Sequence, residues 1–206
     1  MGAGPSVANI RPGAEDFVIA ADAGLAVLQQ WGIMPDLIVG DFDSLGHVPA
    51  GENVTRHPTQ KDDTDLMLAV RTGLARGYKR FLLCGALGGR LDHTMANIQT
   101  LLFLAEQGAQ GFLVGENECL TVIRNGAVTF KAAAVGTISV FAVGGPAGGV
   151  SLCGLRYSLE NAALTPGFPL GVSNAFIGWP ATVKVAQGSL LIYWTGQPDM
   201  IEEKEI

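Results

Sequence analysis

The stretch Ile38-Val39-Gly40-Asp41-Phe42-Asp43-Ser44 indicates both the fold and the chemistry of this chain. It begins as an apolar run, typical of a strand buried on both faces, and ends in closely spaced acids. In an extended segment, side chains two residues apart point the same way, so Asp41 and Asp43 can reach one metal ion. The alternative interpretation is a polar turn in which Asp43 caps the next element.

Two further polar segments lie at the ends of expected elements: Asp62-Asp63-Thr64-Asp65 opens a helical pattern, and Gly88-Gly89-Arg90-Leu91-Asp92-His93 precedes another. Helix capping explains part of the first, with Asp62 as the cap while Asp65 faces a site. If these ends converge, two carboxylates about 4 Å apart repel by roughly 4 kcal/mol at an effective dielectric near 20. A hard cation neutralises such a cluster, and oxygen ligands favour Mg²⁺. The first hypothesis is therefore a Mg²⁺ site that handles phosphate.

The composition is that of a folded protein without a basic surface. The chain has 206 residues and is 48% hydrophobic, which indicates a globular and not a disordered chain. The net charge of −6 and the scattered Lys and Arg residues argue against nucleic acid as a partner. No apolar run approaches the ~20 residues that span a bilayer, so no membrane partner is expected. Three distant cysteines form no zinc or disulfide pattern, which favours a reducing cytoplasm.

The first half of the chain alternates apolar runs with helical patterns, which predicts a parallel, Rossmann-like α/β sheet. The expected strands are 17–21, 37–39, 81–84 and 111–114, and the expected helices are 24–31, 64–76 and 92–107. In such sheets ligands bind outside the carboxyl ends of the strands. Asp22, Asp41 and residues 85–92 should therefore share that edge.

The second half reads as short antiparallel strands, either a sandwich or a barrel. The expected strands are 121–124, 127–130, 137–141, 182–185 and 190–193. Asn125-Gly126 is a strong hairpin signal, whereas Gly171 to Phe176 reads by itself as a loop. We expect an α/β catalytic domain over residues 1–120 and a β-sandwich domain over residues 121–206.

The glycine-rich loop from Gly85 to Arg90 can bring backbone N–H groups and a helix N-terminus close to phosphate. It matches neither the Walker A motif nor the dinucleotide fingerprint. An ordinary tight turn is the alternative, although such a turn needs one glycine more readily than three. Arg90 is a natural partner for phosphate charge, whereas His93 is by default a polar residue of the first helical turn.

Taken in order, these motifs resemble the thiamin pyrophosphokinase family. The segments that carry the resemblance are Asp22-Ala23-Gly24, Pro35 to Ser44, Asp62 to Asp65, Gly88 to His93, and Ser173-Asn174. The resemblance implies a homodimer in which the first domain of one subunit meets the second domain of the other. It also implies a reaction that moves the β,γ-diphosphate of ATP onto the hydroxyl of thiamin, giving thiamin diphosphate and AMP.

The resemblance further implies a role for each matching residue. Asp41, Asp43 and Asp65 would hold Mg²⁺. Nucleotide would contact Asp22, Gly24, Gly85, Gly88, Gly89, Arg90 and His93. Thiamin would contact Ser173 and Asn174, with Asp62 nearby. Catalysis would rest on Asp43, Asp65, Arg90 and Asp92, with Arg90 and Asp92 handling phosphates and aligning the acceptor hydroxyl. Separately from the resemblance, we expect a nearby carboxylate to accept the hydroxyl proton, and Asp92 is the favoured candidate.

Two departures from the family pattern stand out: Ala23 replaces a glycine, and Met1 to Pro5 resembles the turn after a strand, as if the chain were shortened at its start. Two other functions remain open. Asp41 could be the nucleophile of a haloacid-dehalogenase-like, Mg-dependent phosphatase, although no later lysine or cap insertion is well placed. The acidic loops could instead belong to a non-catalytic ligand-binding module.

Overall fold

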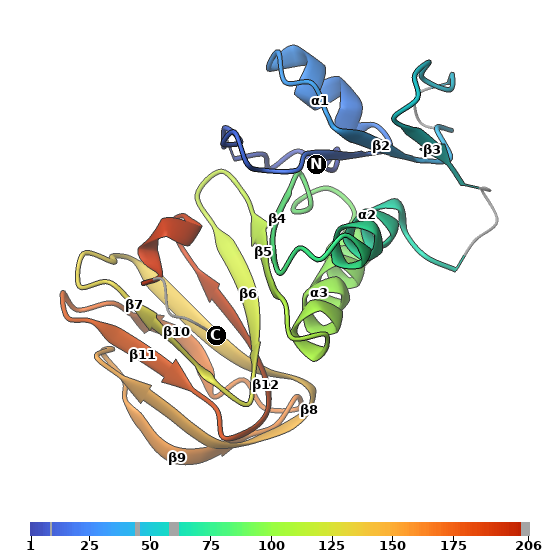
Figure 1. The fold of residues 1–206 in the computed structure, drawn as a ribbon. Helices are drawn as coiled ribbons and strands as arrows, with labels where there is room; N and C mark the ends of the chain where they lie inside the picture. Colours follow the sequence, from blue (N-terminus) through green and yellow to red (C-terminus); the bar gives the residue numbers. More distant parts are fainter. Residues whose placement is uncertain (9, 44–45, 58–61, 203–206) are drawn as a thin grey trace.

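The computed structural model describes residues 1–8, 10–43, 46–57 and 62–202. They form a small parallel sheet and a large curled mixed sheet (Figure 1). The small sheet has the order β1 (Ile19–Ala21), β2 (Leu37–Gly40), β3 (Val54–Arg56), and α1 (Gly24–Gln30) links its first two strands. β1 and β2 are the predicted apolar runs, whereas β3 is short and largely exposed and gave no apolar signal.

The single parallel sheet expected for residues 17–115 is divided between the two sheets. β4 (Arg80–Cys84) and β5 (Gln110–Val114) pair in parallel, but they belong to the large sheet. A tight turn, in which Gly115 N donates to Glu118 O at 2.9 Å, sends the chain back as β6 (Cys119–Arg124), antiparallel to β5. This short return leaves the edge of β5 covered by β6.

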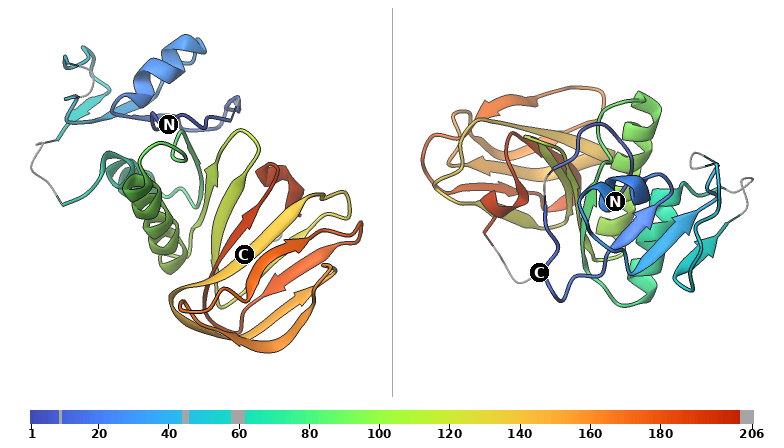
Figure 2. Two further views of the ribbon diagram at one scale, coloured as in Figure 1. Left: turned by 180° about the vertical axis from the view of Figure 1, so that it is seen from behind. Right: turned by 90° about the horizontal axis from the view of Figure 1, so that it is seen from above.

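Two helices span the division between the sheets. α2 (Asp65–Ala75) packs against β1 and β2, and α3 (Leu91–Glu106) packs against β5 and β6. The helices also contact each other, and they lie beside β4 and β5 in both views of Figure 2. Within the described residues, no helix has the length and apolar character needed to cross a membrane.

The rest of the large sheet curls around an aromatic core. Its strands are β7 (Ala127–Phe130), β8 (Thr137–Cys153), β9 (Leu159–Leu164), β10 (Gly171–Ala175), β11 (Ala181–Lys184) and β12 (Gln187–Trp194), followed by the 3₁₀ turn η1 (Pro198–Met200). The long β8 pairs with β12 and β10 along its first part and with β11 and β9 along its second. Inside the curl, Trp194 is fully buried, with ring centroids 5.2 Å from Phe130 and 6.3 Å from Phe112.

The hairpin predicted at Asn125-Gly126 is wrong. β6 pairs with β5 and β12, and β7 pairs with β11. Asn125 has a positive φ of 47°, and its side-chain Oδ1 accepts from Gly188 N at 2.9 Å. The turn therefore bonds to the start of β12 and sends the chain to another strand neighbour. The segment predicted as a loop from Gly171 to Phe176 is largely β10.

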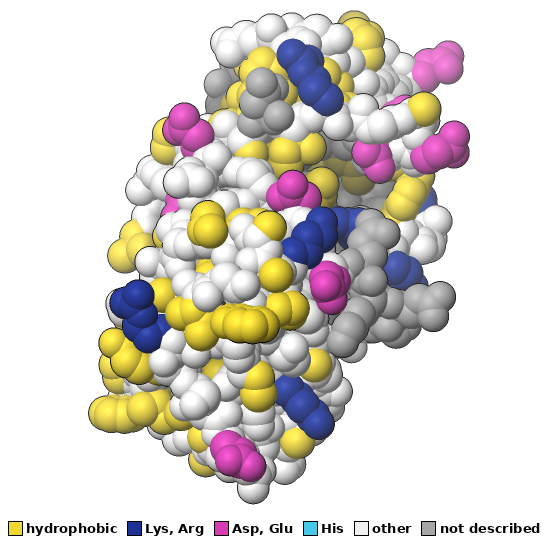
Figure 3. Space-filling view, turned by 90° about the vertical axis from the view of Figure 1, so that its left-hand side faces the viewer, with side chains coloured by type: hydrophobic (Ala, Val, Ile, Leu, Met, Phe, Trp, Pro, Cys, Tyr) yellow, Lys and Arg dark blue, Asp and Glu magenta, His cyan; other side chains and the backbone are white. Residues whose placement is uncertain are grey.

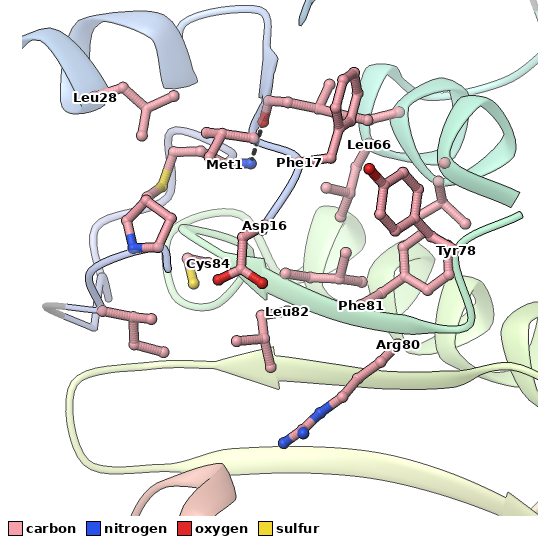
Figure 4. Close-up of a pocket in the computed structure, with 18 of the residues that line it drawn as sticks. Met1, Asp16, Phe17, Leu28, Leu66, Tyr78, Arg80, Phe81, Leu82 and Cys84 are labelled. Carbon is pink, nitrogen blue, oxygen red and sulfur yellow. Dashed lines mark hydrogen bonds between the residues drawn. The ribbon is translucent and has the colours of Figure 1, made fainter. Parts of the chain in front are cut away.

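The first residues of the chain run between the two sheets. Met1 N donates to Ile19 O at 2.7 Å, and Gly2 N donates to Cys84 O at 2.8 Å. Beside them, between β1 and β4, lies a cavity of about 200 Å³ lined mainly by apolar side chains such as Phe17 and Phe81 (Figure 4). Burial lowers the pKa of the Met1 ammonium at this cavity. None of the residues predicted to form a site lines it, so the candidate site lies elsewhere.

Candidate active site

In the segment from Asp41 to Asp43, a buried phenylalanine lies between two aspartates. Phe42 is 2% exposed and packs against Leu25, Leu28 and other residues of an apolar cluster under the small sheet. It adopts a positive φ of 65°, and Asp43 N donates to Asp41 Oδ1 at 3.2 Å. The buried ring thus anchors a turn at the carboxyl end of β2, where the sequence placed both carboxylates. The extended conformation that we expected for this segment is wrong, because the backbone of Phe42 is left-handed. Ser44, which follows in the motif, lies outside the described residues.

Asp22 joins these two aspartates. It follows β1, has a φ of 45°, and its backbone N donates to Val39 O at 2.8 Å. Carboxylate oxygens of Asp22, Asp41 and Asp43 lie within 4.8 Å of one another. The sequence pattern had assigned Asp22 to nucleotide binding, and the fold places it in the acidic group because β1 and β2 are parallel neighbours.

The acidic group fits a hard divalent cation. Among the described residues, Asp22 Oδ1 is a buried oxygen that accepts no hydrogen bond. A buried acceptor without a partner costs roughly 1–3 kcal/mol, and two further carboxylates beside it add repulsion. All three residues offer oxygen, which Mg²⁺ prefers. A cation among them would satisfy the orphan oxygen and neutralise the charge.

The acids before α2 divide into different roles. Thr64, not Asp62, caps the helix, and its Oγ1 accepts from Met67 N at 3.2 Å. The predicted cap at Asp62 is therefore wrong, because a hydroxyl one residue before the helix already satisfies that N–H. Asp63 forms an ion pair with Arg71 at 2.9 Å. Asp65 is the first residue of α2 and lies outside the described group of three carboxylates.

The glycine loop is shaped by backbone conformation and close packing. Gly85, Gly88 and Gly89 all have positive φ values, of 64°, 77° and 66°, which explains why one glycine would not be enough. A Cβ on Gly88 would lie 3.0 Å from Cγ of Pro5, and one on Gly85 would collide with Gly2 O. Residues 2–6 therefore pack directly against the loop. The sequence analysis did not predict this contact, although the small residues Gly2 and Gly4 beside Pro5 are compatible with close packing.

Gly24, a predicted nucleotide contact outside this loop, has a similar packing role. A Cβ on Gly24 would collide with the carbonyl oxygen of Met1. Ala23, which replaces the glycine of the family pattern, adopts a right-handed helical conformation with φ of −62° directly before α1. A Cβ is compatible with that conformation, so the departure at Ala23 requires no backbone strain.

Arg90 and Asp92 bind each other at the start of α3. Arg90 Nε donates to Asp92 Oδ1 at 3.1 Å, and a terminal guanidinium N–H donates to Asp92 Oδ2 at 2.6 Å. This hydrogen bonding lowers the pKa of the Asp92 carboxyl. It also raises the pKa of the Arg90 guanidinium. His93, also exposed, donates its backbone N–H to Asp92 Oδ1 at 3.0 Å. In this arrangement Asp92 is a weaker base than an unpaired aspartate.

Ser173 and Asn174 lie on β10, in the curled sheet. Asn174 is buried, and its amide is fully engaged: Nδ2 donates to Tyr157 O at 2.6 Å, and Oδ1 accepts from Tyr157 N at 2.9 Å. Ser173 is exposed and has a φ of 61°. Tyr157, which the sequence did not single out, is 63% exposed beside this anchor.

Within one chain, β10 and the carboxyl end of β2 lie in different parts of the molecule (Figure 1). The residues predicted to contact thiamin are therefore far from the acidic group of the same chain. An acidic oxygen cluster and a glycine loop with an arginine are typical of enzymes that transfer phosphate groups.

The comparisons with known proteins identify the family. The model for "Thiamin pyrophosphokinase, catalytic domain" matches residues 13–113, and that for "Thiamin pyrophosphokinase, vitamin B1 binding domain" matches residues 128–190. Thiamine pyrophosphokinase of Bacillus subtilis (strain 168) is 28% identical over 181 residues, which cover 84% of this chain and 85% of that protein. The chain belongs to the thiamin pyrophosphokinase family.

Solved structures agree over nearly the whole chain. The crystal structure of thiamine pyrophosphokinase from Bacillus subtilis matches with a TM-score of 0.83 at 24% identity, covering 95% of this chain and 97% of that one. Thiamin pyrophosphokinase from Geobacillus thermodenitrificans matches with a TM-score of 0.81 at 27% identity, covering 97% of each chain. The division into a small and a large sheet therefore belongs to a shared fold.

Proposed function

We propose that this protein transfers the diphosphate of ATP to the hydroxyl of thiamin, giving thiamin diphosphate and AMP. Family membership supports the reaction, and the observation that carries the proposal is the convergence of Asp22, Asp41 and Asp43. Residues 1–120 would form the α/β, Rossmann-like catalytic domain. Residues 121–206 would form the sandwich-like domain that contributes to thiamin binding, with the boundary inside β6.

Mg²⁺ would be held by Asp41 and Asp43, with Asp22 as a further oxygen donor and Asp65 approaching from the start of α2. The orphan oxygen of Asp22 supports this assignment. When bound, the ion would supply positive charge to phosphate oxygens. We therefore propose Asp43 and Asp65 as catalytic carboxylates, because they would hold the ion.

The nucleotide phosphates would lie against the loop that contains Gly85, Gly88 and Gly89, with Gly24 and His93 at its margins. Arg90 would exchange the carboxylate of Asp92 for phosphate oxygens, because both are anions that a guanidinium binds in a fork. Asp92 would then be free of its hydrogen bonds to Arg90 and available to align or deprotonate the thiamin hydroxyl. Transfer of this kind depends on positioning and electrostatic stabilisation, which these groups supply.

Thiamin would contact Ser173 on β10, with Asn174 acting through the position of Tyr157 and with Asp62 nearby. We propose that the site is completed in a homodimer, by β10 of one subunit facing the acidic group of its partner. The distance between these elements within one chain supports this arrangement.

Exposed hydrophobic side chains also favour the homodimer. Tyr157, Phe168, Leu170, Val172, Ile177 and Trp179 are all exposed, by 42% to 67% of their surface. Figure 3 shows hydrophobic side chains exposed over the curled sheet on one face of the molecule. Exposed apolar patches of this kind commonly mark protein interfaces. We also propose a cytoplasmic location, which the buried free thiols of Cys84 and Cys119 support.

Incubation with ATP, MgCl₂ and thiamin, followed by chromatography, tests the proposal. Equal amounts of AMP and thiamin diphosphate are expected, and none without thiamin. Release of inorganic phosphate without AMP, or a phosphorylated Asp41, would instead support the phosphatase. Thiamin binding without turnover would indicate a binding module.

A further inference from the structure

Asn97 is a buried amide that connects α3 to the glycine loop. It is 8% exposed, and its Nδ2 donates to the backbone oxygen of Ala86 at 2.8 Å. Ala86 is itself only 6% exposed, so water cannot readily replace this donor. A buried carbonyl that loses its partner bears the full cost of its desolvation.

The bond from Asn97 completes a row of three anchored carbonyls. Gly85 O accepts from Gly4 N at 2.7 Å, Ala86 O accepts from Asn97, and Leu87 O accepts from Ser6 N at 3.4 Å. Because a peptide unit is planar and trans, fixing each oxygen also fixes the direction of the next N–H. Asn97 is the only side chain in this row, since the other two donors are main-chain groups.

The same helix connects this anchor to Arg90. Arg90 is the N-cap of α3, and its carbonyl accepts from Thr94 N at 3.2 Å. Asn97 lies two turns further along, on the face of α3 that contacts the loop. Asn97 therefore connects the middle of the loop to the same rigid helix that begins after Arg90, the last residue of the loop.

We infer that Asn97 is a positioning residue for the phosphate-binding loop from Gly85 to Arg90. The inference rests on the proposed function, because it takes ATP as the ligand of that loop. Without the amide, the peptide units around Ala86 lose their fixed direction, and ATP binds more weakly while thiamin binding is unaffected.

The variant Asn97→Leu tests the inference, because leucine has a similar size and no donor. We expect the Kd for ATP, measured by calorimetry with MgCl₂, and the KM for ATP to rise roughly tenfold, as loss of about 1.4 kcal/mol implies. The KM for thiamin should stay within about twofold, since the proposed thiamin contacts Ser173 and Asn174 lie on β10 and not in this loop. Asn97→Ser keeps a shorter hydrogen-bond donor, so its Kd for ATP should lie between those of wild type and Asn97→Leu. If Asn97→Leu does not fold, Asn97→Ser takes its place in the test.

Thr100→Val is the matched control. Thr100 is 1% exposed on the same helix, but its Oγ1 donates to Ala96 O within α3 and not to the loop. Its variant should change melting temperature without changing the Kd for ATP. An unchanged Kd for ATP in Asn97→Leu would overturn the inference about Asn97 but not the proposed function. So would a rise in the Kd for ATP in Thr100→Val as large as that in Asn97→Leu. Wild-type protein that binds ATP but makes no AMP would overturn only the proposed activity, and wild-type protein that binds no ATP would overturn both.

Discussion

Gly40 leaves little room for a side chain beside Asp22. A Cβ built on Gly40 would lie 3.1 Å from the Asp22 Cα and 3.3 Å from its backbone N. The glycine that precedes Asp41 therefore lets the ends of β1 and β2 approach closely enough for their aspartates to share one site.

Replacing Gly40 with alanine should damage both stability and metal binding. The new methyl would meet backbone atoms, which cannot move aside as a flexible side chain can, so we expect a loss of about 1–3 kcal/mol in unfolding free energy. Displacement of Asp22 should also weaken Mg²⁺ binding, measured by calorimetry. Gly167→Ala is the control, because a Cβ there meets nothing within 4 Å. Equal Mg²⁺ affinity in the two variants would contradict the role of Gly40.

Asp22→Asn should have opposite effects with and without metal. In metal-free protein, removal of one of three neighbouring negative charges relieves repulsion, so the melting temperature should not fall. With Mg²⁺ at about 100 times its Kd, wild type should gain about 2.7 kcal/mol of stability, and the variant should gain much less. Calorimetric melts with Mg²⁺ or EDTA measure both effects.

Asp63→Asn is the matched control for that experiment. Asp63 is also an acid near the proposed site, but it pairs with Arg71 and not with the three-carboxylate group. Its variant should keep the full Mg²⁺-induced rise in melting temperature. If Asp63→Asn lost that rise as completely as Asp22→Asn, the metal assignment would be wrong.

Arg90→Gln should raise the pKa of the Asp92 carboxyl toward its usual range. Hydrogen bonding from Arg90 is the largest cause of the lowered pKa, so the pair is formed at neutral pH and is lost as pH falls through that lowered value. Carbon-13 NMR titration of the Asp92 carboxyl measures the change. Diphosphate transfer should also fall by roughly 100-fold or more, because a charged donor to the phosphates is gone. A Lys variant that restores the lowered pKa without restoring activity would show that charge alone is insufficient.

Asn174→Ala should act through Tyr157. The variant leaves the backbone N–H and C=O of Tyr157 without their partners, at a cost of about 1–3 kcal/mol in unfolding free energy. The KM for thiamin should rise while the Kd for ATP stays unchanged. Asn117→Ala, at an exposed position, serves as the control. A rise in the Kd for ATP, or a KM for thiamin equal to that of wild type, would contradict this assignment.

Apart from β3, the strand and helix positions in the first half followed from the sequence because their signals are local. Leu37 to Val39 is apolar on both faces, and the structure buries it completely. The position of Asp41 and Asp43 after a strand also followed from the sequence, but the turn at Phe42 replaces the extended segment that we expected, and the burial of Phe42 was not anticipated. Strand partners are non-local: β4 pairs with β5 in the large sheet and not with β1 or β2, so the single parallel sheet did not form.

Other features could not be read from the sequence, because they depend on contacts between distant residues. Asn125-Gly126 is compatible with a hairpin, but its bonds to the start of β12 give β6 a different neighbour. Tyr157 carries no motif, and only its bonds to Asn174, 17 positions away, place it beside a predicted site residue. The close approach of Asp22 to both Asp41 and Asp43 likewise depends on the pairing of β1 with β2.

The burial of Phe42 fixes the number of residues that the site can have between Gly40 and Asp43. Insertion or deletion of a single amino acid between Gly40 and Asp43 would shift which side chain is buried. A carboxylate would then lie in the apolar core, and the Phe42 ring would lie in water. Chain length here is as constrained as residue identity, so natural variants should show no insertions or deletions between Gly40 and Asp43.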